Sequence, residues 1–411
     1  MTDPVRAAVD EAFRTEWGHV VATLIRVTGD WDLAEECAQE AFAKALASWP
    51  RDGVPRRPGA WLTTAARNRA LDKLRRGAAE ETRLRGLALT AADDDEAPEP
   101  DDVPDDRLRL MFTCCHPALP LEAQVALTLR TLAGLTTPEI ARAFLVPEAT
   151  MAQRIVRAKR KIRNARIPYR VPPAELLPER TSGVLGVLYL LFNEGYAASA
   201  GADLVRQSLT AEAIRLARVV AGLLPAAPEA GGLLALMLFH DARRATRTDD
   251  AGDLVTLADQ DRTRWDRTLI DEGVRVLDEA LALGRPGPYQ LQAAIAACHA
   301  TAARAEDTDW ARIARLYELV ARLNPSPVVE LNRAVAVAMA DGPAAGLALV
   351  DGLAEGGNLA GYHLLPATRA DFLRRLGRDE EAVAAYRAAL DLAPTGAERR
   401  YLARRIGELD P

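Results

Sequence analysis

The sequence predicts an all-α protein with two small helical domains followed by a long C-terminal helical-repeat domain. Apolar residues make up 49% of the 411 positions, whereas aromatic residues make up only 5%. Alanine, leucine and arginine dominate the composition, and all three favour helices. Long alternating runs of β-branched residues, which would indicate strands, are absent. A chain of this length is expected to form about two to four domains.

Charge is distributed unevenly, although the net formal charge of the chain is only −6. Residues 51–92 carry 10 basic and 4 acidic side chains, and residues 107–170 carry 12 basic and 3 acidic ones. Between these blocks, residues 93–106 carry 9 acidic side chains and no basic one. Two basic segments separated by an acidic one indicate two separate contacts with a polyanion.

The four cysteines do not have the spacing of a disulfide framework. No signal peptide opens the chain, and the longest apolar stretch is far shorter than the ~20 residues that cross a bilayer. We therefore expect a soluble, cytoplasmic protein with no membrane partner.

The first domain is expected over residues 1–77 and contains an acidic helix followed by a basic one. Residues 32–46 combine apolar positions at helical spacing with a narrow acidic face, and Asp30 or Asp32 can cap this helix. Taken alone, such a face is simply solvated. The second helix, residues 61–76, carries arginines, an asparagine and a tryptophan, which can hold phosphates, stack on a base and bond its edge.

Residues 78–106 are expected to form an acidic, flexible linker. From Asp93 to Asp106 the chain combines acidic residues with prolines. Because like charges repel and proline lacks a backbone donor, no packed structure is expected there.

The second domain is expected over residues 107–170 and contains a helix-turn-helix pattern. Thr136 and Glu139 have the spacing of a capping box at the start of a short helix. A turn at residues 145–147 leads into a long helix over residues 149–164, whose first residues are placed to meet bases and whose later basic residues meet phosphates. A solvated basic helix is the alternative, but the capping box, turn and second helix together favour DNA binding.

Residues 171–411 are expected to form a helical, tetratricopeptide-like domain. Gly342 and Gly377 close predicted helices 35 residues apart, close to the length of one tetratricopeptide unit. The repeat is expected most clearly over residues 310–411. A generic helical bundle with chance spacing is the alternative, and it is harder to exclude over residues 180–300.

No pattern indicates catalysis, a metal site or a cofactor. The string Cys114-Cys115-His116 has no partner motif, so we expect both thiols to pack in a core. The histidines lack the carboxylate or serine spacing of a hydrolase, and no glycine-rich phosphate loop is visible. The unusual string from Phe192 to Tyr196 is expected to be a helix end, with a binding role as the alternative.

Three segments in this order resemble a known family. Residues 34–42 are similar to the sigma-factor helix that binds the clamp of the RNA polymerase largest subunit. Residues 61–76 are similar to the helix that opens and reads the −10 promoter element, and the helix-turn-helix resembles the domain that reads the −35 element. The chain as a whole resembles an extracytoplasmic-function sigma factor with a C-terminal tetratricopeptide-like extension.

The resemblance implies core RNA polymerase and promoter DNA as partners, and a protein or small-molecule regulator on the C-terminal domain. The residues implied in core-polymerase binding are Asp32, Glu35, Glu36, Gln39, Glu40 and Phe42. Those implied at the −10 element are Trp61, Arg67, Asn68, Asp72, Lys73, Arg75 and Arg76. Those implied at the −35 element are Thr137, Ala149, Thr150, Ala152, Gln153, Arg154, Arg157, Lys159, Arg160 and Lys161. Leu145 and Ala149 stand where the family usually has glycine, which affects the expected base contacts.

The implied function is to direct core polymerase to specific promoters and start transcription, with no catalysis by this chain. One alternative is a stand-alone helix-turn-helix activator with a repeat sensor domain. Residues 32–42 and 61–76 argue against it, because an activator needs neither. A repeat-based enzyme or scaffold with an incidental basic domain is a third class, and no nucleophile–base pairing supports its enzyme form.

Overall fold

The computed structural model confirms the all-α prediction, since the residues that it describes form helices and no β-strand. These residues are 4–84, 106–144, 146–197, 204–249, 253, 255–357, 359–393 and 396–409. The chain divides into two compact units, Met1–Leu188 and Tyr189–Pro411. None of the described helices is both long enough and apolar enough to cross a membrane.

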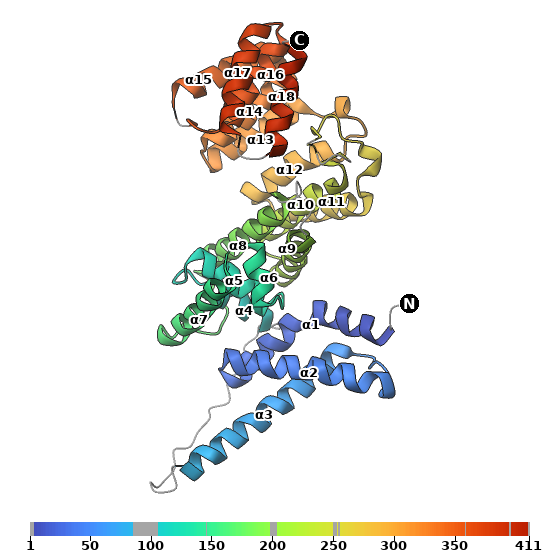
Figure 1. Ribbon diagram of the computed structural model, residues 1–411, viewed down its shortest axis with the longest axis vertical. Coiled ribbons are helices and arrows are strands. Elements are labelled where there is room, and N and C mark those ends of the chain that lie inside the picture. Colours follow the sequence, from blue (N-terminus) through green and yellow to red (C-terminus); the bar gives the residue numbers. More distant parts are fainter. Residues whose placement is uncertain are drawn as a thin grey trace. The chain divides into compact units, whose positions relative to one another are not determined.

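Three long helices form the first part of unit 1 (Figure 1). They are α1 (Pro4–Thr28), α2 (Trp31–Asp52) and α3 (Pro58–Leu84), and each packs against the other two. Trp17, Leu24, Trp49 and Leu62 are almost completely buried between them. Burying such large side chains removes enough apolar surface from water to hold the three helices together.

Both helices that carry the predicted contacts extend beyond their expected ends. The helix α2 continues through Pro50 to Asp52, where Gly53 donates its backbone N–H to the Trp49 carbonyl at 3.0 Å and adopts a φ of 81°. Proline removes only one helical hydrogen bond, and it does so here in the last turn. The helix α3 begins before residue 61 and reaches into the segment expected to be a linker. The rest of that predicted linker, residues 85–105, lies outside the described residues.

Four shorter helices form the second part of unit 1, and they confirm the helix-turn-helix prediction. They are α4 (Asp106–Cys114), α5 (Leu121–Thr131), α6 (Thr137–Ala143) and α7 (Glu148–Asn164). The capping box is present, because Thr136 Oγ1 accepts from the Glu139 N–H and the Glu139 carboxylate accepts from the Thr136 N–H at 2.7 Å. Leu145, in the predicted turn, lies outside the described residues.

The helix α8 (Leu177–Ala197) crosses the division between the units. In unit 2 it is followed by α9 (Leu204–Leu223), α10 (Pro228–Ala242), α11 (Arg267–Ala282) and α12 (Pro288–Ala300). The helix α10 is buried along most of its length and packs against α9, α11 and α12. The helix α11 packs especially close to α10 at Gly273, where a Cβ atom would lie only 2.8 Å from the Phe239 ring.

The last part of unit 2 is a series of helical hairpins (Figure 1). Its helices are α13 (Trp310–Leu323), α14 (Pro327–Asp341), α15 (Pro343–Glu355), α16 (Leu364–Arg375), α17 (Asp379–Leu392) and α18 (Gly396–Leu409). Each helix packs against the next. Gly342 and Gly377, with φ of 103° and 71°, follow α14 and lie in the turn after α16, so the hairpin recurs at the predicted spacing. The helical-repeat prediction for residues 310–411 is therefore confirmed.

Candidate polymerase and promoter interface

The predicted polymerase-binding residues of α2 lie in three different environments. Asp30 caps the helix by accepting from the N–H groups of Asp32 and Leu33 at 2.9 and 3.1 Å. Asp32, Glu36 and Gln39 are exposed, Glu40 is half-buried, and Glu35 and Phe42 are buried.

The structure changes the interpretation of Phe42. Its side chain is only 5% exposed and packs edge-on against Phe13, with the ring centroids 5.1 Å apart. Trp17 lies on the same cluster. Phe42 therefore stabilises the helix from inside the domain, and a partner protein cannot reach it in this arrangement.

Ion pairs join the acidic face of α2 to the basic face of α3. Lys73 contacts the carboxylates of Glu36 and Glu40 at 2.8 and 2.9 Å, and Arg69 also donates to Glu40. Hydrogen bonds from Arg69 and then Lys73 lower the pKa of Glu40, so this carboxyl stays ionised. Lys73, predicted to contact the −10 element, is therefore engaged within its own domain.

The other predicted −10 residues are accessible. Arg67, Asn68, Asp72, Arg75 and Arg76 are exposed on α3. Trp61 is half-buried: its ring meets Trp49 edge-on at a centroid distance of 5.6 Å, and the Lys44 ammonium lies 5.9 Å from its centre. The edge-on contact with Trp49 and the nearby Lys44 cation fix the position of the indole.

The helix α7 presents a row of exposed, mostly polar side chains opposite its buried side, and this row is called the polar row below. Met151, Ile155, Ala158 and Ile162 are buried and hold it against the domain. The predicted −35 residues exposed on α7 are Ala149, Thr150, Gln153, Arg157, Arg160 and Lys161. Thr137, Ala152 and Arg154 are half-buried.

One exposed residue of this row was missed by the sequence reasoning. Val156 is 63% exposed and lies between Gln153 and Arg160 at helical spacing. An apolar side chain at such a position suits the methyl group of thymine. Its signal in the sequence was weak, because Val156 directly follows the buried Ile155 and looks like part of the apolar side.

Lys159 does not lie on the exposed row. Its side chain is only 9% exposed, and its Nζ donates to Glu35 at 2.7 Å and to Asp32 at 2.8 Å. Arg130 also donates to Glu35, at 2.9 Å. A residue predicted to bind a DNA phosphate is thus paired with two residues predicted to bind polymerase, and in this arrangement it reaches no phosphate.

Further contacts join α1–α3 to the part of unit 1 that contains α4–α7, at the junction where Lys159 meets Glu35. The Tyr169 hydroxyl donates to the Ala22 carbonyl at 2.8 Å, and burial raises the pKa of Tyr169 well above its ordinary value. Arg26 pairs with Asp106 at 2.9 Å. A Cβ on Gly18 would lie 2.8 Å from the Leu132 carbonyl oxygen, so the two backbones approach closely. The two predicted domains of unit 1 therefore pack directly on each other.

The two adjacent cysteines, Cys114 and Cys115, pack in a core, as expected. Cys114 and Cys115 are buried free thiols, 3.3 Å from Thr131 Oγ1 and 3.7 Å from Thr128 Oγ1 respectively. Burial raises the pKa of the Cys115 thiol to about 12. Both thiols are therefore protonated at neutral pH and act as small apolar groups.

Comparison with known proteins assigns three segments of the chain. Residues 13–80 match the family model of Sigma-70 region 2, and residues 109–162 match that of Sigma-70, region 4. Residues 180–281 match a family of unknown function, DUF6596. These boundaries agree with α1–α3, with α4–α7 and with the start of the extension.

An uncharacterized protein of Rhizobium meliloti is 45% identical over 406 residues, which cover 98% of this chain and 96% of that protein. The "Probable ECF RNA polymerase sigma factor SigI" of Mycobacterium tuberculosis is 28% identical over 177 residues, which cover 42% of this chain and 59% of that protein. The crystal structure of yeast Tom70 aligns with 98% of this chain and 85% of its own, at 11% identity and a TM-score of 0.34, which is too low to bear on the fold.

Two sigma regions in the expected order, on the helices that the structure describes, establish the family. The chain belongs to the sigma-70 family of RNA polymerase sigma factors, with regions 2 and 4 in order, and carries an all-helical C-terminal extension.

Proposed function

We propose that this sigma factor uses three surfaces to place core RNA polymerase at a promoter. The exposed acids and Gln39 of α2 bind the polymerase, the exposed face of α3 captures the −10 element, and the polar row of α7 reads the −35 element. The row on α7 carries this proposal, since it presents Gln153, Val156 and Arg157 above a buried apolar side. RNA synthesis itself is the chemistry of the polymerase.

The basic residues of α7 supply affinity through phosphates. Arg157, Arg160 and Lys161 are exposed together with Arg163. Neutralising about 4–6 phosphates makes log affinity fall with log salt at a slope of about −4 to −5. Gln153 and Val156 would then carry the discrimination among base pairs.

The packed junction between regions 2 and 4 has to separate during this function. The −10 and −35 elements lie about 25 base pairs apart, which is about 85 Å along the duplex. In the structure Lys159 of region 4 contacts Glu35 of region 2 at 2.7 Å. Because α2 and α3 are only about 33 and 40 Å long, the packed arrangement cannot span both elements. The free chain is thus closed, and polymerase and promoter together stabilise an open form.

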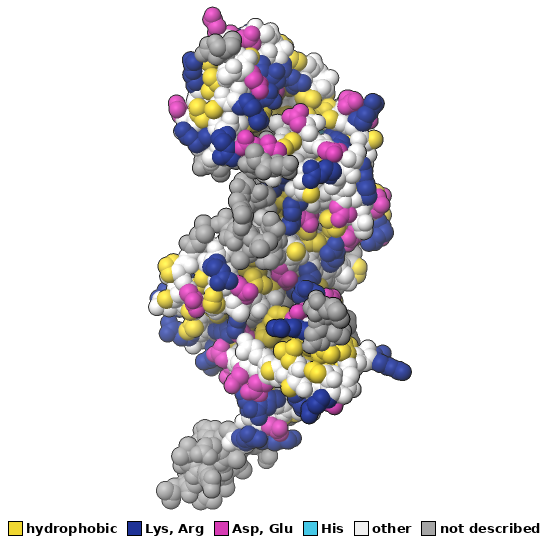
Figure 2. All heavy atoms as spheres, turned by 45° about the vertical axis from the view of Figure 1, so that its right-hand side comes forward, with side chains coloured by type: hydrophobic (Ala, Val, Ile, Leu, Met, Phe, Trp, Pro, Cys, Tyr) yellow, Lys and Arg dark blue, Asp and Glu magenta, His cyan; other side chains and the backbone are white. Residues whose placement is uncertain are grey.

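The C-terminal extension is proposed to regulate this sigma factor in cis or through a regulator that binds it. Acidic and basic side chains are intermixed over the part of unit 2 seen in Figure 2, which does not favour a third DNA contact there. Transcription by chains with and without residues 180–411 tests the role of the extension. Identical transcription under every condition would rule out regulation in cis.

Run-off transcription with purified core polymerase on genomic fragments tests the function directly. We expect the wild-type chain to confer defined start sites. The double variant Glu36→Lys with Gln39→Lys reverses the exposed face of α2 and should abolish binding to core polymerase. Glu122→Lys, an exposed control on α5, should not. Core-independent activation of transcription would instead support the stand-alone activator.

A further inference from the structure

Two arginines, Arg243 and Arg247, lie beside the segment from Phe192 to Tyr196, for which the sequence indicates no clear function. The Arg247 guanidinium lies 3.6 Å from the centre of the Tyr196 ring and donates to the Tyr196 carbonyl at 2.7 Å. Arg243 lies 3.2 Å from Nδ1 of His240. Phe192 stacks on Tyr196 with the ring centroids 5.3 Å apart. The end of α8 and the end of α10 therefore build one cationic, aromatic wall.

The positive charge of this wall is not neutralised at Arg243. Burial, together with the neighbouring Arg243 and Arg247, lowers the pKa of His240 to about 3, so this imidazole is neutral at physiological pH. Arg244, one residue further on, pairs with Asp241. No carboxylate among the residues that the structure describes forms an ion pair with Arg243. An anion placed beside it would therefore be stabilised.

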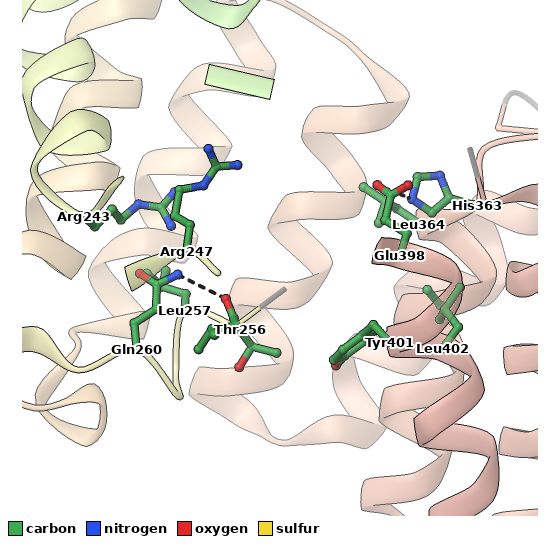
Figure 3. A pocket seen from close by; sticks show the side chains of 12 residues that line it. Arg243, Arg247, Thr256, Leu257, Gln260, His363, Leu364, Glu398, Tyr401 and Leu402 are labelled. Carbon is green, nitrogen blue, oxygen red and sulfur yellow. Dashed lines mark hydrogen bonds and ion pairs between the residues drawn. The ribbon is translucent and has the colours of Figure 1, made fainter. Parts of the chain in front are cut away.

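Both arginines line a cavity of about 340 Å³ within unit 2. Figure 3 shows them on one side and His363, Glu398 and Tyr401 on the other. The remaining lining is largely apolar and includes Val255, Leu257, Leu364, Ala367 and Leu402. A volume in the range of about 300–1,000 Å³, with apolar walls and a few polar groups, is typical of a small-molecule site.

We propose that this cavity binds a small organic acid. Its carboxylate lies on Arg243 and Arg247, its apolar body rests on Leu257 and Leu402, and a hydroxyl group at its far end donates to Glu398. Glu398, which also lies 3.4 Å from Nε2 of His363, stands opposite the arginines and selects for such a molecule, because a second acidic group there would be repelled. An effect of the bound acid on transcription depends on the proposed regulatory role of the extension, whereas binding itself can be measured without polymerase.

Three matched probes test the proposal by titration calorimetry on the full chain. Benzoate carries the carboxylate and an apolar ring, 4-hydroxybenzoate adds the hydroxyl group, and benzamide is a neutral analogue of benzoate. We expect saturable binding of one molecule per chain, with 4-hydroxybenzoate tighter than benzoate. Benzamide should bind at least about tenfold more weakly, because it cannot form charge-assisted hydrogen bonds with the arginines.

Two variants and a control locate the site. Arg243→Gln should weaken benzoate by about tenfold or more, whereas Arg322→Gln, which removes the same charge from an exposed position of α13, should bind like wild type. Glu398→Gln should reduce the preference for 4-hydroxybenzoate and leave benzoate affinity within about threefold. Circular dichroism and Tm confirm that each variant is folded.

The proposal is overturned if benzamide binds as tightly as benzoate, or if folded Arg243→Gln binds like wild type. It is also overturned if no probe shows saturable binding up to about 10 mM. Binding that occurs as expected while transcription stays unchanged would contradict the regulatory role and leave the site established. The two failures are thus distinguishable.

Discussion

Replacing Lys159 with alanine tests whether buried ion pairs hold regions 2 and 4 closed. The Lys159 side chain is 9% exposed and contacts Glu35 and Asp32. Glu35 keeps Arg130 at 2.9 Å, and the Asp32 side chain is 73% exposed, so neither carboxylate becomes an orphaned buried charge. The closed form should therefore lose about 1.5–3 kcal/mol, the contribution of charged hydrogen bonds, rather than the about 3–5 kcal/mol of a broken buried pair.

That loss shifts the equilibrium toward the open form by about tenfold to 150-fold. If closure withholds Glu35 from core polymerase, Lys159→Ala lowers the apparent Kd for core by up to this factor, because apparent affinity scales with the open fraction. If Lys159 only contacts a DNA phosphate, core affinity stays constant and the salt slope of DNA binding becomes shallower by about 0.9.

Fluorescence anisotropy of labelled chain titrated with core polymerase separates these outcomes. Lys161→Ala is the matched control, since it removes the same charge from an exposed position on the same helix. Lys161→Ala should weaken DNA binding without changing core affinity. Unchanged core affinity in Lys159→Ala would refute the reasoning.

Three further substitutions probe the stability of unit 1 and its contact with DNA. Phe42→Ala should lower the free energy of unfolding by about 3–5 kcal/mol because it opens a cavity in the core. A denaturation midpoint equal to that of the wild type would show that the Phe42 ring is not buried in the core. Gly134→Ala should cost about 1–3 kcal/mol in thermal denaturation, since φ is 75° and the new Cβ would lie 2.9 Å from the Phe13 ring; full stability would contradict this close approach. Arg157→Ala should weaken promoter binding and make the salt slope shallower by about 0.9, and an unchanged slope would exclude a phosphate contact.

Local patterns predicted the helices and the helix-turn-helix well. The Thr136–Glu139 capping box and the apolar spacing of Ile155 and Ile162 are short-range signals, and the structure confirms them. The glycine spacing of the C-terminal hairpins is equally local, because it depends on turns that recur along the chain.

Burial of individual site residues depended on contacts that sequence spacing does not encode. Glu35 and Lys159 are 124 residues apart, and each looks like an exposed charge on its own helix. The resemblance of its neighbours to a family segment places Phe42 on a binding surface, yet its ring packs on Phe13. The cavity beside Arg243 likewise joins segments far apart in the chain, so no local pattern could indicate it.

The distance between α3 and α7 tests the closed-to-open account most directly. Cysteines introduced at the exposed residues Thr64 and Asn164 can carry spin or fluorescent labels, because the native cysteines of the chain are buried. In the free chain we predict a separation below about 40 Å, set by the helix rise and the interaxial spacing of the packed helices. With core polymerase and promoter DNA bound, it should exceed about 60 Å. The same short distance in both states would contradict the account.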